Sequence, residues 1–89
     1  MNAILSVIGK DTIGIVADVS VECAKYNANI TDVSQSILGE YFAMIMVVNI
    51  DRLSVEFTEF ADRMKESGKK KNLEIQVMHE DIFNSMHKI

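Results

Sequence analysis

Two hydrophobic periods alternate along the chain, one typical of β-strands and the other of α-helices. Short apolar runs predict strands at 3–8, 41–50 and 73–77. The run 41–50 is the clearest, because β-prone residues fill it almost completely. Strict alternation in 73–77 predicts a strand with one face on the core, whereas the nearly continuous run 3–8 predicts a strand covered on both faces. The segment 30–37 is more polar, but the turn signals at its two ends predict a fourth strand that enters a hairpin at 38–40.

Helical spacing predicts one helix after the first strand and another after the third. The apolar stripe of the first helix consists of Ile13, Val16, Ala17, Ser20, Cys23 and Ala24. We expect Asp11 or Thr12 to cap this helix and the turn residues 27–29 to end it. The stripe of the second helix consists of Leu53, Phe57, Phe60, Ala61 and Met64. Ser54 is its expected N-cap, and Gly68 is expected to stop it.

The last ten residues form a short amphipathic segment of their own. Its apolar positions are Ile82, Phe83, Met86 and Ile89. A segment this short is ordered only when it docks, so we expect a helix that lies against its own sheet or against a partner. The sequence therefore predicts a domain at 1–79 and a C-terminal helical extension at 80–89.

The element order βαββαβ indicates an α+β fold, the ferredoxin-like sandwich. It predicts a four-stranded antiparallel sheet with strand order 4-1-3-2, two helices on one face, and the short C-terminal helix in addition. The second face of the sheet has no helix to cover it. Ile45 and Val47 would point to that open face. Uncovered apolar residues on a sheet face are a physical reason to expect a homodimer.

Composition and charge narrow the function. The 89 residues carry a net charge of -4, which opposes binding to nucleic acid or to anionic membranes. The first apolar run is too short for a signal peptide or a membrane span, and the single cysteine, Cys23, cannot form an internal disulfide. We therefore expect a cytoplasmic protein. The triplet 69–71 is all lysine, and we interpret it as a solvated helix end rather than a partner-binding patch.

The same fold serves metal chaperones, RNA-binding modules, hydrolases of acyl phosphates and ligand-sensing modules, so residues must decide among them. A soft-metal chaperone needs paired thiolates, and this chain has a single cysteine. An RNA-binding module needs exposed aromatic residues on a basic surface, whereas this chain has a net charge of -4. A phosphoryl hydrolase needs an arginine near the first loop, whereas Arg52 and Arg63 lie at or in the second helix. His79 and His87 are too far apart in sequence for a tight metal site. We expect no catalytic residue, no metal and no cofactor.

The loop from Gly9 to Gly14 joins the first strand to the N-terminus of a helix. Free N–H groups and the positive end of the helix dipole favour a carboxylate at such a place. Gly14 has no Cβ, so a ligand can approach its backbone closely. Alternatively, Gly14 serves only close packing of the helix on the sheet.

At these residues the chain resembles the ACT domain, whose loop typically reads Asp-x-x-Gly and whose second strand begins with Asn-Ile. The matching residues are Asp11-Thr12-Ile13-Gly14 and Asn29-Ile30. The segments Val7–Asp11 and Gly14–Ala17 are also similar to the glycine-cleavage repressor group. The segments 78–83 and 86–87 are similar to a family of small single-ACT proteins. Many ACT domains have proline where this chain has Ile13, which indicates a looser loop.

The resemblance implies a dimer in which a small ligand lies between one protomer's loop and the partner's Asn29–Ile30 edge. The implied ligand-binding residues are Lys10, Asp11, Ile13, Gly14, Ile15, Asn29 and Ile30. Backbone groups of Gly14 and Ile15 would hold the ligand carboxylate, and Asp11 and the partner's Asn29 would supply polar contacts. Asp11 has the simpler alternative of an N-cap, Asn29 that of a turn residue, and Lys10 that of a solvated side chain.

The function that we expect is a non-catalytic regulatory module that binds a small molecule, an amino acid, at a dimer interface. The alternative is a protein-interaction adaptor that uses the open sheet face and the C-terminal helix and binds no small ligand.

Overall fold

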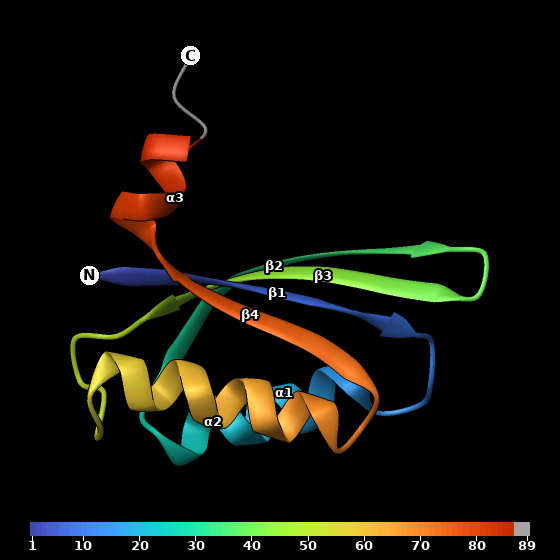
Figure 1. Cartoon of the computed structure of the whole chain (residues 1–89), viewed down its shortest axis with the longest axis horizontal. Coiled ribbons are helices and arrows are strands. Elements are labelled where there is room, and N and C mark those ends of the chain that lie inside the picture. Colours follow the sequence, from blue (N-terminus) through green and yellow to red (C-terminus); the bar gives the residue numbers. More distant parts are fainter. Residues whose placement is uncertain (87–89) are drawn as a thin grey trace.

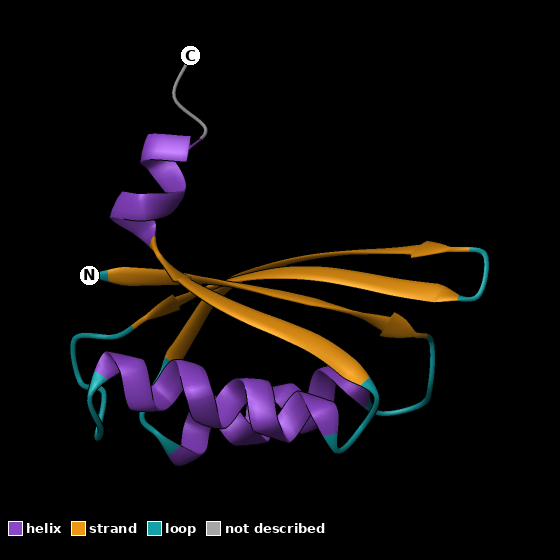
Figure 2. Ribbon diagram, in the orientation of Figure 1, coloured by secondary structure: helices purple, strands orange, loops and turns teal. Residues whose placement is uncertain are grey.

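A computed structural model gives the fold and describes residues 1–86. The elements follow in the order β1 (Asn2–Lys10), α1 (Ile15–Lys25), β2 (Asn29–Leu38), β3 (Tyr41–Asn49), α2 (Phe57–Lys69), β4 (Leu73–His79) and α3 (Glu80–Met86). The strands form one antiparallel sheet in the order β2-β3-β1-β4. Helices α1 and α2 cover one face of this sheet (Figures 1 and 2). The predicted fold class and strand order are confirmed.

The core lies between the sheet and the two helices. Alternate residues of β1 and β3 point into it, and their partners from α2 are Phe60 and Met64, both fully buried. The prediction that the first strand is covered on both faces is wrong, since Ile8 on its second face is 52% exposed. The reason is that both long helices pack on the same side of the sheet. Each strand therefore has one buried face and one open face in the single chain.

Helix α1 turns a different stripe to the sheet than the one predicted. Burial of Cys23, which belongs to the predicted stripe, is confirmed, but the other buried residues are Ile15 and Val19, whereas Ile13 and Val16 of the predicted stripe are exposed. The helix carries apolar residues on two of its faces. The helical period indicated the face with more of them, but the face with fewer packs against the sheet. Burial of the Cys23 thiol, with the nearby Glu22 carboxylate, raises its pKa to about 11. The thiol is therefore neutral near pH 7.

The predicted ends of the second helix are also wrong. Helix α2 has Glu56 as its N-cap, with no side-chain capping hydrogen bond, in place of Ser54. Gly68 lies inside the last turn and is buried. A Cβ at Gly68 would lie 2.7 Å from Ile75 Cγ1 and 2.9 Å from the Leu73 carbonyl oxygen. The glycine therefore allows α2 to approach β4, and it does not end the helix.

Helix α3 stands apart from the core. Within Glu80–Met86 no residue is buried, and Ile82 and Met86 are 55% and 64% exposed. The helix contacts β1 and β4 and stands on the side of the sheet away from α1 and α2 (Figure 1). His87 and Ile89, which the sequence singled out, lie outside the described residues. Of the helices that the structure describes, none is both long and apolar enough to cross a membrane.

Candidate functional site

The loop between β1 and α1 is held at one end of the sheet and is open to solvent. The Asp11 N–H donates a 2.8 Å hydrogen bond to the carbonyl oxygen of Glu40, in the turn between β2 and β3. Lys10 Nζ also lies 3.9 Å from Glu40 Oε1. Residues 10–14 are all exposed. The β2–β3 turn thus fixes the start of a loop whose remaining surface is free in the single chain.

Gly14 is the N-cap of α1, so the prediction that Asp11 or Thr12 caps this helix is wrong. Gly14 has φ 88° and ψ 9°, the left-handed conformation, and no side chain caps the helix. A Cβ at this position would meet nothing within 4 Å. The alternative that Gly14 serves close helix-to-sheet packing is therefore also wrong. The glycine is needed for its positive φ, and it leaves the first N–H groups of α1 without a side-chain cap.

Replacing Gly14 with valine should lower the free energy of unfolding by about 1–2 kcal/mol, because β-branched residues are strained at positive φ. Gly14→Asn is the matched control, since asparagine tolerates this conformation and should cost less than half as much. Urea denaturation followed by circular dichroism measures both. Equal stabilities of Gly14→Val and the native chain would contradict the left-handed cap.

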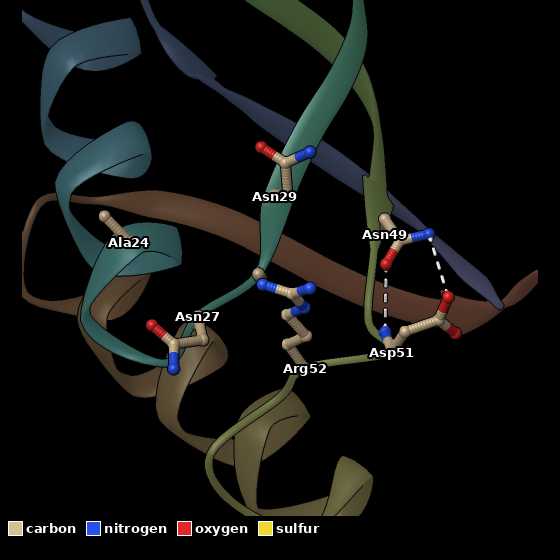
Figure 3. A pocket seen from close by; sticks show the side chains of 7 residues that line it. Ala24, Asn27, Asn29, Asn49, Asp51 and Arg52 are labelled. Carbon is tan, nitrogen blue, oxygen red and sulfur yellow. Dashed lines mark hydrogen bonds between the residues drawn. The ribbon is translucent and has the colours of Figure 1, made fainter.

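A pocket of about 580 Å³ lies at the opposite end of the sheet, around Asn29. Its walls are the C-terminal part of α1, the turn that follows, the start of β2 and the segment after β3. The lining residues are Ala24, Asn27, Ala28, Asn29, Asn49, Asp51 and Arg52. Figure 3 shows the Arg52 side chain extending toward the start of β2, with Asn27 on one side and Asp51 on the other.

Backbone hydrogen bonds fix the walls of this pocket. Ser54 N–H donates to the Tyr26 carbonyl at 2.9 Å, which joins the segment after β3 to the turn after α1. Leu53 N–H donates to the Ile50 carbonyl at 3.2 Å and closes a tight turn around Arg52. Ile50 N–H donates to the Met1 carbonyl at 2.9 Å. The pocket is therefore shaped before any ligand arrives.

Asp51 has an oppositely charged partner, whereas Arg52 has none within residues 1–86. The Asp51 carboxylate pairs with the N-terminal ammonium and accepts a 3.4 Å hydrogen bond from Asn49 Nδ2. These two hydrogen bonds and the ammonium charge hold the pKa of Asp51 below its ordinary value. Within residues 1–86, the Arg52 guanidinium has no ion pair and no hydrogen bond. The pocket thus presents one unbalanced positive charge.

The structure places the predicted site residues in two groups that do not meet within one chain. Lys10 pairs with Tyr41 at one end of β1, and Asn2 pairs with Asn49 at the other. Nine residues of strand separate the two groups by roughly 25 Å. Lys10, Asp11, Ile13, Gly14 and Ile15 belong to the loop, and Asn29 and Ile30 belong to the pocket end.

Two of the predicted residues can offer little more than their backbones. The Ile15 side chain is buried, and the half-buried Ile30 packs against the core. By contrast, Ile13 is fully exposed and free to make contacts. The assignment of these residues to a ligand stays a prediction. Among the described residues there is no group of three or more His, Cys, Asp or Glu side chains that could hold a metal ion.

Sequence reasoning missed Arg52 and Asn49 as site residues. By itself, the pair Asp51-Arg52 indicates only a break after the third strand. A signal was present, because a two-residue hairpin turn at Gly39-Glu40 places the start of one strand opposite the end of the next. In the structure Asn29 indeed lies opposite Asn49. Counting back from the turn would have brought the Asp51-Arg52 pair to the Asn29 end.

Comparison with known proteins shows the family and the fold of the chain. A profile of the ACT domain family matches residues 2–78. A UPF0237 protein of Listeria innocua serovar 6a is 45% identical over 89 residues, which is the full length of both chains. An ACT domain protein from Streptococcus pneumoniae superposes with a TM-score of 0.83 at 41% identity, covering 93% of each chain.

A more distant solved structure shares the fold alone. It is assigned as a glycine cleavage system transcriptional repressor, and it superposes with a TM-score of 0.72 at 18% identity. The superposition covers 85% of this chain and 43% of the repressor chain. With the profile match over 2–78 and the full-length relatives, the conclusion is direct: the chain belongs to the ACT domain family.

Proposed function

We propose that the chain is a cytoplasmic, non-catalytic regulatory module that binds a free amino acid at a site shared by two copies. The observation that carries this proposal is the separation of the glycine loop from the Asn29 pocket. Each half has groups suited to one part of an amino acid, and roughly 25 Å of sheet keeps them apart in one chain. A second copy that brings its loop to the pocket would complete the site.

The edge strand β2 offers a way to bring the two halves together. It lies at the border of the sheet, and nearly all of its residues are exposed. When two copies of an edge strand pair antiparallel about a two-fold axis, the start of one strand lies beside the end of the other. Asn29 begins β2, and the glycine loop is tied to the turn after Leu38. Pairing through β2 therefore directs each loop toward the partner's pocket.

Exposed apolar residues beside this edge support the same pairing. Val33 and Ile37 lie opposite Met46 and Phe42 on the helix side of β2, yet they are 41% and 61% exposed. Helix α1 packs near β2, and its exposed residues include Val16. Val16 was predicted to pack in the core but is exposed here, where a second copy can cover it.

The proposed contacts follow from the chemistry of the two halves. Backbone N–H groups at Gly14 and Ile15 receive the α-carboxylate, because the N-terminus of α1 is uncapped and carries the positive end of the helix dipole. Asp11 of the same loop and Asn29 of the partner subunit accept hydrogen bonds from the ammonium group. The pocket beside Asn29 then holds the side chain of the amino acid.

Thermal unfolding with each of the twenty amino acids tests this function. A ligand present at one hundred times its Kd stabilises the native state by about 2.7 kcal/mol, which raises Tm by roughly 10–20 °C in a domain of this size. We expect such a shift for at least one amino acid. If no amino acid changes Tm, the proposed sensing function is wrong.

The open sheet face favours a second candidate, a protein-interaction adaptor. Ile8 and Ile45 are about half exposed on this face, and a shallow hollow lies between them. Helix α3 stands beside the same face with Ile82 and Met86 exposed. An adaptor would bind a polypeptide here and leave the glycine loop empty, so it predicts no response to amino acids.

A further inference from the structure

Arg52 is fixed in position by its backbone, and within residues 1–86 its side chain has no ion pair and no hydrogen bond. The turn closed by the Leu53 N–H to Ile50 carbonyl hydrogen bond holds the Arg52 backbone, and the Ser54 N–H to Tyr26 carbonyl bond anchors the segment that follows. Figure 3 shows the guanidinium lying across the pocket below Asn29. Because the backbone is already fixed, binding an anion orders only the side-chain rotamers of Arg52 and no further part of the turn.

The charge around Arg52 suits an anion. The acidic residue of the pocket lining, Asp51, is paired with the N-terminal ammonium. Asn49 is also engaged with Asp51, since its Nδ2 donates to Asp51 Oδ2 at 3.4 Å and its Oδ1 accepts from the Asp51 N–H at 3.0 Å. In a protein with a net charge of -4, this pocket is a local positive site. An unpaired guanidinium beside it forms charge-assisted hydrogen bonds with a carboxylate.

Two amide side chains complete the polar lining. Asn27 and Asn29 line the pocket on the α1 side, and within the described chain neither side chain makes a hydrogen bond. Each amide offers both a donor and an acceptor. Ala24 and Ala28 supply small apolar surface to the same lining. A pocket of about 580 Å³ has room for a short aliphatic chain that ends in a polar group.

We infer that Arg52 makes the site selective for amino acids whose side chain ends in a carboxylate. This inference rests on the proposed function, in which the α-carboxylate lies on the partner's glycine loop. The guanidinium is then left for a second anionic group of the same ligand. Asn27 hydrogen-bonds the same carboxylate, Asn29 keeps its contact with the ammonium group, and the alanines contact the methylene groups. Arg52 is thus a specificity-determining residue.

Isothermal titration calorimetry of the full chain with L-glutamate, L-aspartate, L-glutamine and L-asparagine tests this inference. We expect one acidic amino acid to bind roughly 10- to 100-fold more tightly than its amide, the range that one charge-assisted hydrogen bond supplies. Arg52→Gln should remove this preference, and Arg52→Lys should keep part of it. Arg63→Gln is the matched control, because Arg63 is an exposed arginine of α2 paired with Glu59 at 3.6 Å.

The outcomes separate this inference from the proposed function. Loss of the acidic preference in Arg52→Gln alone supports the assignment. Equal binding of acidic and amide ligands by the native chain overturns it and leaves amino acid sensing intact. An equal loss for glutamate and glutamine in Arg52→Gln overturns it too, because Arg52 would then bind the α-carboxylate. Failure of every amino acid in the thermal panel overturns both proposals.

Discussion

Val33→Asp should convert the proposed dimer to a monomer, weakening self-association at least about 100-fold. Val33 lies near the middle of β2, so in a two-fold pairing of β2 strands its two copies come close to the symmetry axis. The substitution therefore places two carboxylates near each other in a contact that valine keeps apolar, which adds repulsion to the desolvation of both charges. In the single chain Val33 is 41% exposed, so the fold itself should tolerate the change.

Sedimentation velocity over a range of protein concentrations measures this effect. The matched control is Ile45→Asp, which puts the same charge on the open sheet face at a residue of similar exposure, 48%. Pairing through β2 predicts a dimer for Ile45→Asp and a monomer for Val33→Asp. The reverse pattern would show that the open face is the interface, and a native chain that stays monomeric would contradict the shared site.

The same variant links assembly to ligand binding. In a Val33→Asp monomer the glycine loop and the Asn29 pocket remain at opposite ends of β1. A ligand can then contact only one of them, so the thermal response to the amino acid should disappear with the dimer. This coupling is what a regulatory module needs, because a ligand that binds only the dimer also favours the dimer.

The order of the elements could be predicted because each has a distinct period. The alternation in Leu73–Val77 and the apolar run at 41–50 leave little choice but strands, and the βαββαβ order permits few topologies. The run at 41–50 is apolar on both faces, and its buried residues are Phe42, Met44, Met46 and Val48. Local periodicity was therefore sufficient for the type and order of these elements.

Features that depend on tertiary contact could not be predicted in this way. Helix α1 has apolar residues on two faces, and only its position on the sheet decides that Val19 is buried and Val16 is not. Gly68 follows the apolar stripe of α2 and was therefore predicted to stop the helix. Its actual role depends on Ile75 of β4, because a Cβ at Gly68 would lie 2.7 Å from Ile75 Cγ1. The loop of the candidate site carries a motif, whereas the pocket around Arg52 forms from two separate segments, 24–29 and 49–52, and has no contiguous signature.

Phe60→Ala should be the most damaging single substitution in the core, lowering the free energy of unfolding by about 3–5 kcal/mol. Phe60 is fully buried, and its ring meets the Tyr26 ring edge-on, with centroids 6.0 Å apart. Truncation leaves a cavity between α2 and the sheet and removes this aromatic contact. A domain of 89 residues has only about 4–13 kcal/mol of stability in total. The variant should therefore be partly or wholly unfolded near 37 °C.

Phe57→Ala is the matched control, because Phe57 lies one turn earlier on α2 but is only half-buried, with its ring 5.8 Å from the His79 ring. Its loss removes less buried surface and leaves no enclosed cavity, so it should cost less than half as much as Phe60→Ala. Urea denaturation gives both values.

Because Tyr26 also anchors the pocket wall through its carbonyl, Phe60→Ala should weaken amino acid binding as well, whereas Phe57→Ala should not. Equal losses of stability in the two variants would contradict the placement of Phe60 at the centre of the core.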